Sequence, residues 1–313
     1  MFTIAMSDDR GMEIRQLETF LAVARELNFT RAAEELHTAQ SAVSATVQGL
    51  ERDLGAELFD RAPRRVTLTP AGAALLPRAR DVLDAARAAR DAVAASAGRV
   101  TGSLTIGFMA SVTLVDIPRL LGRFGRLHGD VTISLATSPH GTGGLADMLR
   151  RGEIDVAFLA AGTGLDQGIR SRTLAASPLV LALPEGHSWA GRTRVSLEEA
   201  VGEARIDFPE GFGNRTIVDR RIASAGLSRT VRLETNDIAD AAELVRNGLG
   251  GAFLPRFIVD RGDPLPWVEV TGLDSELAVA IAVSSERRLS EAARRLWALA
   301  LDGNPGAEED GRS

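Results

Sequence analysis

Apolar residues between positions 12 and 54 fall into three short runs with helical spacing, and the break before the third run constrains the fold most. The first run extends from Met12 to Leu27. Thr30 is a suitable N-cap for a second helix from Arg31 to Leu36, and a short turn follows it. A third helix is expected from Gln40 to Leu54, where Gly55 is the stop signal. Three short helices with a tight turn before the third predict a helix-turn-helix.

The third helix has two chemically different faces. Its inward face is apolar, with residues recurring at steps of three and four: Val43, Val47, Leu50 and Leu54. The opposite face carries mainly amides, hydroxyls and one guanidinium: Gln40, Ser41, Ser44, Ala45, Gln48 and Arg52. Such side chains hydrogen-bond to base edges in a major groove, and an arginine can reach a phosphate. A solvated helix face has the same polarity, so a neighbouring basic element is needed to favour DNA binding.

That basic element is a predicted hairpin, or wing. Its strands are expected at Leu58 to Arg61 and Val66 to Thr69. Residues 61–80 contain five arginines and no acidic residue, although the whole chain has a net charge of −6. A local basic patch of this kind suits contact with the DNA backbone. Besides the third helix, the residues expected to contact DNA are Thr30, Arg31, Arg61, Arg64 and Arg65.

Pro70 begins a long alanine-rich helix that is expected to end near Ala97. Its apolar positions alternate steps of four and three, which is the seam of a short coiled coil. The seam can pair with a second copy of the chain, or it can pack on the chain's own N-terminal domain. We favour pairing, because DNA-binding regulators usually act as symmetric dimers. The residues assigned to the dimer contact are Leu75, Ala79, Val82, Ala86 and Val93.

Strands and helices alternate after an expected hinge at Gly98 to Gly102. Apolar runs predict strands at residues 104–108, 131–135, 154–159, 205–208, 231–233, 251–254 and 277–283. Helices are expected at residues 114–124, 145–151, 215–225, 238–247 and 290–301. This order predicts an α/β domain with a largely parallel sheet.

The run from Met12 to Gly72 resembles the N-terminal domain of the LysR-type transcriptional regulators. The resemblance is carried by Phe-Thr-Arg-Ala-Ala at the second helix, Ala-Val-Ser in the third, Leu-Gly-Ala-Glu-Leu-Phe before the wing and Leu-Thr-Pro-Ala-Gly after it. It implies a regulator that binds double-stranded promoter DNA as a dimer or tetramer, with RNA polymerase as a further partner.

The third helix departs from the family pattern at two points. Ala39, Gln40 and Ser41 stand where the family often has Ser, Gln and Pro. Ala45 stands where an arginine often follows the inner serine. We therefore expect DNA specificity to depend on Gln40, Ser41 and Gln48 or on DNA shape, rather than on guanine contacts from position 45.

Residues 101–301 resemble the two-lobed effector-binding domain of the same family. The segments that carry this resemblance are Gly102 to Gly107, Leu149 to Phe158 and Gly248 to Pro255. The fold class implied is an all-α winged helix-turn-helix with a long linker helix, followed by an α/β domain like the type 2 periplasmic binding proteins. The expected organisation is a flexible extension at 1–11, a winged helix-turn-helix at 12–70, a linker helix at 71–98, a first lobe at 101–161 and 267–302, a second lobe at 162–266 and a disordered tail at 303–313.

A ligand cleft is expected between the lobes, where parallel strands end and helices begin. Helix amides and hydroxyl donors favour a small carboxylate or other anion, whereas Glu210 and Asp237 leave a cationic or polyol ligand open. Thr142 also matches the family's effector loop. The other polar residues have equally good roles as helix caps or solvated loop residues. The expected effector contacts are Met109, Ser111, His140, Thr142, Phe208, Glu210 and Asn236.

The sequence contains no cysteine, and its four histidines are not at ligand spacing, so we expect no metal. No glycine-rich stretch has the spacing of a phosphate-binding loop, and no serine lies in a nucleophile elbow. We therefore expect no enzyme and no cofactor. The N-terminal residues carry no apolar leader and no stretch could span a membrane, which predicts a cytoplasmic protein with no membrane partner. A solute-binding module without regulatory coupling is the alternative for the C-terminal half.

Overall fold

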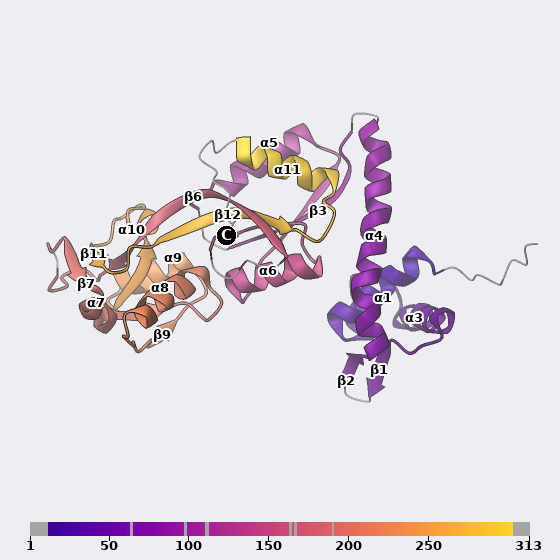
Figure 1. The fold of residues 1–313 in the computed structure, drawn as a ribbon, viewed down its shortest axis with the longest axis horizontal. Coiled ribbons are helices and arrows are strands. Elements are labelled where there is room, and N and C mark those ends of the chain that lie inside the picture. The colour runs from indigo at the N-terminus through magenta and orange to yellow at the C-terminus, as the bar shows by residue number, and fades with distance from the viewer. Residues whose placement is uncertain are drawn as a thin grey trace, which may run out of the picture. The chain divides into compact units, whose positions relative to one another are not determined.

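The computed structural model describes residues 12–62, 65–96, 99–109, 113–162, 165, 168–189 and 191–302. They form two compact units, one up to Arg90 and one from Asp91 onward. Figure 1 draws the first unit in indigo and violet, and the second from violet through magenta and orange to yellow.

The first unit has the elements of a winged helix-turn-helix. They are α1 (Ile14–Glu26), α2 (Phe29–Glu35), α3 (Gln40–Leu54), β1 (Phe59–Ala62), β2 (Arg65–Leu68) and the long helix α4 (Pro70–Ser96), whose last residues, from Asp91, belong to the second unit. The two strands pair antiparallel and form the wing. The helices enclose one apolar core whose fully buried side chains include Leu17, Phe20, Val47 and Leu50. Burying each such side chain contributes about 2 kcal/mol, so this core orients α3 against the other helices.

Two details of the first unit differ from expectation. Asn28 caps α2 in place of Thr30, because its side chain accepts hydrogen bonds from the backbone N–H groups of Thr30 and Arg31 at 2.9 and 3.2 Å. The helix therefore begins earlier than expected. Leu54 is 42% exposed instead of buried, because it ends α3 where Gly55 turns the chain with a φ of 66°.

The beginning of α4 packs on the core of its own unit. Ala79 is fully buried there, and the partly buried Leu75 packs against the same cluster. Ala79 is therefore unavailable to a second helix, contrary to our assignment of it to the dimer contact. Farther along α4, Val82 and Val93 are 40% and 73% exposed.

The second unit is an α/β structure. Its elements are β3 (Gly102–Phe108), α5 (Ile117–Leu127), β4 (Val131–Ala136), α6 (Gly141–Arg151), β5 (Val156–Ala160), β6 (Ile169–Ala182), β7 (Arg194–Ser196), α7 (Leu197–Glu203), β8 (Ala204–Asp207), α8 (Gly213–Ser224), β9 (Leu233–Glu234), α9 (Ile238–Arg246), β10 (Gly251–Pro255), α10 (Arg256–Val259), β11 (Trp267–Thr271), β12 (Glu276–Ser284) and α11 (Glu291–Asp302). The main path through its sheet is β4-β3-β5-β12-β6-β10-β8-β9, with β11 beside β6 and β7 beside β11.

The sheet is mixed, which corrects the expectation of a largely parallel one. β3 pairs parallel with β4 and β5, and β8 pairs parallel with β9 and β10. Between these two parallel groups lie β12 and β6, which are antiparallel to each other and to the strands beside them. Each parallel group forms the centre of one lobe, and β6 and β12 run between the lobes (Figure 1).

The chain passes from the first lobe to the second, and back again, at later residues than we expected. Strand β6 pairs with β12 from Ile169 to Pro178 and with β10 from Leu179 to Ala182, so it crosses between lobes at its middle. Strand β11 packs in the second lobe's core through Val268 and Val270, although we assigned residue 267 onward to the first lobe. A turn at residue 162 precedes a continuous strand, so it does not mark the lobe boundary.

Candidate functional site

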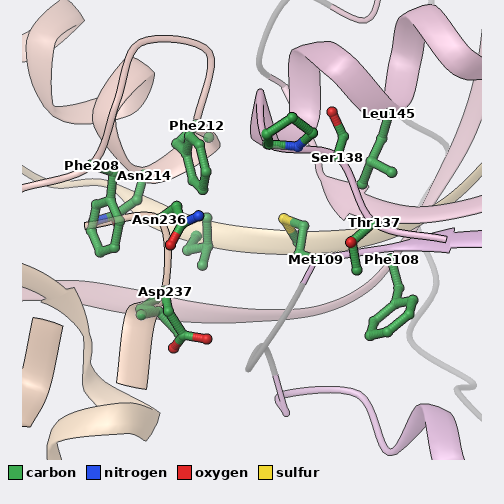
Figure 2. Close-up of a pocket in the computed structure, with 15 residues that line it drawn as sticks. Phe108, Met109, Thr137, Ser138, Leu145, Phe208, Phe212, Asn214, Asn236 and Asp237 are labelled. Atoms are coloured by element: carbon green, nitrogen blue, oxygen red, sulfur yellow. The ribbon is translucent and has the colours of Figure 1, made fainter. Parts of the chain in front are cut away.

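A pocket of about 270 Å³ lies between the two lobes of the second unit. Figure 2 shows residues of the first lobe facing residues of the second across this space. The residues that line it are Phe108, Met109, Thr137, Ser138, Pro139, Gly141, Leu145, Phe208, Phe212, Gly213, Asn214, Asn236, Asp237, Ile238 and Leu277. The volume is close to the lower end of the range for small-molecule sites, so the pocket suits a compact metabolite.

The first-lobe wall forms where parallel strands end. Phe108 and Met109 lie at the carboxyl end of β3, and residues 137–139 follow β4. Gly141 then begins α6 with a φ of 55°, and a Cβ at this position would lie 2.9 Å from the ring of Phe212. Glycine is therefore required for the two lobes to approach here. The backbone N–H of Gly143 also donates to the carbonyl of Gly211 at 3.2 Å, which joins the lobes beside the pocket.

The second-lobe wall comes from three segments. Phe208 follows β8, residues 212–214 begin α8, and residues 236–238 begin α9. Asn214 is 5% exposed, and its Nδ2 donates to the carbonyl of Phe253 at 2.7 Å. Its Oδ1 is buried without a hydrogen-bond partner in the described part of the chain. The first turn of α8 is thereby anchored to β10 while its N-terminus faces the pocket.

Among the described residues, the lining is mostly apolar and contains no arginine or histidine. The ionisable side chain among these described lining residues is Asp237, whose carboxylate caps α9 by accepting from the N–H groups of Ala239 and Asp240. The N-cap positions of α6 and α8 are His140 and Phe212, and neither side chain caps its helix. At α6 the N–H groups of Gly141 and Gly143 donate to the carbonyls of Ser138 and Gly211, so the positive potential there comes from the helix dipole rather than from free N–H groups. The arrangement can bind a ligand with an apolar body and a negative group.

The structure brings three of the expected effector contacts together: Met109, Phe208 and Asn236. Thr142 does not line the pocket, because it is 1% exposed and its hydroxyl bonds within the first lobe. It accepts from the N–H of Ala160 at 3.2 Å and donates to the sulfur of Met109 at 3.5 Å. His140 and Glu210 are exposed and lie outside the lining. Ser111 lies outside the described residues.

Several lining residues were not among the effector contacts expected from the sequence. They are Thr137, Ser138, Phe212, Asn214 and Ile238. Their only signal was position, since each follows the carboxyl end of a strand or begins a helix. Thr142 was expected because it matches the family's effector loop and His140 because its side chain can donate, but neither lines the pocket.

A group of charged side chains lies behind the second-lobe wall, and we call it the Asp207 cluster: Asp207, Arg215, Asp219, Arg229 and Glu234. Asp207 is 1% exposed and directly precedes the lining residue Phe208. Burial raises the pKa of Asp207 to about 6, against the lowering effect of Arg229 and Arg215. This carboxyl group therefore titrates close to neutral pH.

The reading face of α3 in the first unit is open to solvent. Gln40, Ser41, Gln48 and Arg52 are exposed, and Ser44 is half-buried. On the wing, Arg65 is also exposed, whereas Arg64 lies outside the described residues. An exposed row of amides, hydroxyls and guanidinium groups is the surface that a DNA groove requires.

Two of the arginines expected to contact DNA are engaged within the unit. Arg61 pairs with Glu51 at 2.8 Å, donates to the Ser44 hydroxyl at 3.3 Å and lies 4.9 Å from the ring centre of Phe29. Arg31 pairs with Glu26 at 2.8 Å. The Arg61 contacts hold the wing to α3, and the Arg31 ion pair holds α2 to α1. Both side chains therefore have structural roles.

Two family models together match nearly the whole described chain. Residues 14–73 match the bacterial regulatory helix-turn-helix proteins of the lysR family, and residues 97–304 match the LysR substrate binding domain. The chain belongs to the LysR family of transcriptional regulators. It is therefore a DNA-binding regulator with an effector-binding domain, in a family that is not enzymatic.

Individual proteins of known sequence or structure are similar to this chain over most of its length. The HTH-type transcriptional regulator ShiR of Corynebacterium glutamicum (strain R) is 34% identical over 243 residues, which are 77% of this chain and 82% of that protein. The crystal structure of full-length CbnR complexed with its target DNA has a TM-score of 0.59 at 25% identity and covers 93% of this chain and 99% of that one. A full-length OxyR variant from Pseudomonas aeruginosa has a TM-score of 0.68 at 22% identity, covers 97% of this chain and 100% of that one, and shows the same fold.

Two further observations concern the described residues alone. None of their helices combines the length and the apolar character that crossing a membrane requires. They also contain no group of three or more histidine, aspartate or glutamate side chains placed to hold a metal ion.

Proposed function

We propose that this LysR-family regulator binds promoter DNA as a homo-oligomer and that a small anionic metabolite in the interlobe pocket modulates this binding. The observation that carries the proposal is the pocket itself, which is lined from both lobes and faced by the N-termini of α6 and α8. A ligand that contacts both walls changes the balance between open and closed lobes, because it binds the closed state better.

DNA contact is assigned to the exposed face of α3 and to the wing. Gln40, Ser41 and Gln48 supply the groups for reading base edges, and Arg52 and Arg65 supply charge for phosphates. Ser44 is held by Arg61, so its hydroxyl has a fixed direction on this face. Arg64 is assigned to the same wing contact from the sequence alone.

The dimer contact is assigned to the later part of α4. Val82 and Val93 are large apolar side chains that are 40% and 73% exposed, and Ala86 lies between them on the seam. Exposed apolar residues repeated along one helix face are covered when a second helix packs on them. A dimer holds two helix-turn-helix units in fixed spacing, which operator recognition requires.

The chemistry of the pocket supports an amphipathic carboxylate as effector. Phe108, Met109, Phe212 and Leu277 can surround an apolar body. No basic side chain lines the described part of the pocket, so a carboxylate there would bind to the first backbone N–H groups of α8 and to the helix dipoles. Asp237 accepts from the N–H groups that it caps, and the positive end of the α9 dipole offsets part of its negative charge.

Thermal unfolding of the full chain tests this proposal against a panel of small carboxylates, each paired with its uncharged amide. A bound carboxylate at 100 times its Kd should stabilise the protein by about 2.7 kcal/mol, and its amide should give little shift. Thr137→Trp should abolish the shift, because this exposed lining residue would fill the pocket. Thr132→Trp, exposed on β4 a few residues before Thr137 and outside the lining, is the matched control. A shift that survives Thr137→Trp, or amides as effective as acids, would contradict the proposal.

A further inference from the structure

The Asp207 cluster is connected by sequence to all three segments of the second-lobe wall. Asp207 directly precedes Phe208, Arg215 directly follows Asn214, and Glu234 lies two residues before Asn236. The cluster residues and the lining residues therefore share three short backbone segments.

Arg215 is the centre of this arrangement. Its Nη1 donates to the carbonyl of Phe208 at 3.0 Å and lies 3.3 Å from both Asp207 Oδ2 and Glu234 Oε1. Its Nε forms a short ion pair with Asp219 on the next turn of α8. One side chain thus joins the end of β8, the first turns of α8 and the end of β9.

Arg229 completes the cluster from the loop after α8. Its side chain is 4% exposed, and its Nη2 contacts Asp207 and lies 2.7 Å from Asp219 Oδ1. Its Nε and Nη1 are buried without hydrogen-bond partners in the described part of the chain, and its guanidinium lies 5.7 Å from the ring centre of Phe253. Arg229 thus leaves two buried donors unsatisfied, which is a cost to the packed state.

The cluster holds three carboxylates and two guanidiniums, so it has one negative charge in excess when all five groups are ionised. Helix α8 contributes Arg215 and Asp219, the following loop contributes Arg229, and β9 contributes Glu234. Strand β10, which packs on the other side, has no charged residue between Gly251 and Pro255. Asp219 and Glu234 are 43% and 51% exposed and remain hydrated, so Asp207 is the member that burial affects most.

We propose that Asp207, Arg215 and Arg229 are positioning residues of the effector pocket, and that uptake of one proton by this cluster in mildly acidic solution stabilises the second-lobe wall. The regulator's response to its effector is then linked to pH. This inference rests on the proposed function only in naming the pocket as the effector site.

The direction of the effect follows from linkage. A buried carboxyl group that holds its proton up to a pH of about 6 favours the packed wall below that pH, because an opened wall exposes Asp207 to water, where its pKa is near 3.8. With these two pKa values, the packed wall gains about tenfold over the opened wall between pH 7.5 and pH 5.0.

Amide hydrogen exchange of the full chain, followed by mass spectrometry from pH 5.0 to 7.5, tests the proposal without an effector. After correction for intrinsic exchange, protection of residues 206–216 and 233–240 should rise about tenfold toward pH 5.0. Asp207→Asn, which resembles the protonated group in shape, should remove this dependence. Asp240→Asn, an exposed acid on α9 outside the cluster, should keep it.

Constant protection of the second-lobe wall in the wild-type protein would overturn the proposal. It would also be overturned if Asp207→Asn kept the wild-type dependence, or if the first-lobe strand at residues 104–108 showed an equal change. If Asp207→Asn does not fold, the proposal is still tested in the wild-type protein. The test is then the pH dependence of amide exchange in the second-lobe wall, compared with that of the first-lobe strand. The exchange experiment uses no effector, so a negative result there does not affect the proposed function. A negative result in the carboxylate panel likewise does not affect the pH dependence of exchange.

Discussion

Replacing Arg65 with alanine removes an exposed guanidinium from the wing, whereas replacing Arg61 removes one that already has partners. Arg65 is exposed on β2. Arg61 pairs with Glu51 at 2.8 Å and donates to Ser44 at 3.3 Å. If the wing binds phosphates, the two variants should change DNA binding in different ways. Arg65→Ala should lower the salt dependence of binding, and Arg61→Ala should mainly destabilise the unit, by about 1 kcal/mol.

The size of the Arg65 effect follows from counterion release. Each phosphate contact contributes a slope of about −0.9 to a plot of log affinity against log salt concentration. A dimer with two wings would lose two contacts, so Arg65→Ala should flatten the slope by about 1.8. Between 50 and 200 mM salt, the wild-type affinity should then fall about twelvefold more than that of the variant.

Fluorescence anisotropy with a mixed-sequence DNA duplex can measure both slopes, because this electrostatic contribution is independent of sequence. Chemical unfolding of the same variants measures stability. A wild-type slope for Arg65→Ala would show that Arg65 does not contact phosphates. The different roles assigned to the two arginines are refuted if Arg61→Ala flattens the slope as much as Arg65→Ala without loss of stability.

Three further predictions concern the cap of α2, the reading helix and the Asp207 cluster. Asn28→Ala should lower the free energy of unfolding by about 1 kcal/mol, while Thr30→Ala leaves it nearly unchanged in chemical denaturation. Gln48→Ala should alter the sequences selected from a random duplex library more than it lowers affinity for mixed-sequence DNA; an unaltered selection would remove Gln48 from base reading. The raised pKa of Asp207 means that the native state binds its proton more tightly than the unfolded state, so this group should add about 2 kcal/mol of stability as pH falls from 7 to 4. Asp207→Asn should lack that contribution, and equal pH profiles for the two proteins would contradict it.

The first unit could be predicted closely because its signals are local. Helical spacing and the glycine stop defined α3, and two short strands flanking arginines defined the wing. The errors there concern single side chains, at the helix ends for Asn28 and Leu54 and within α4 for Ala79. Asn28 and Thr30 are both good caps by type, and only the backbone path decides which of them reaches the free N–H groups.

The second unit was predicted less completely because its organisation depends on distant pairing. Strand β6 is paired along its length with strands β10 and β12, whose residues lie about 70 to 115 positions later. No local pattern reveals where such a strand passes between lobes. Thr142 illustrates the same limit at the site, since its hydroxyl chemistry suits a ligand but the packing of α6 on β5 directs it to Ala160.

The proposal that an effector changes how this regulator contacts DNA can be tested by DNase I footprinting on a promoter fragment that the protein selects. The footprint is recorded with and without the carboxylate that stabilises the chain most in the thermal panel. We expect this carboxylate to change the length or the bend-dependent cleavage pattern of the footprint, because lobe closure alters the spacing of the DNA-binding units. Thr137→Trp should bind the same fragment and show no change with the carboxylate. If the carboxylate binds the wild-type protein and the footprint is the same with and without it, effector binding does not change DNA contact as proposed.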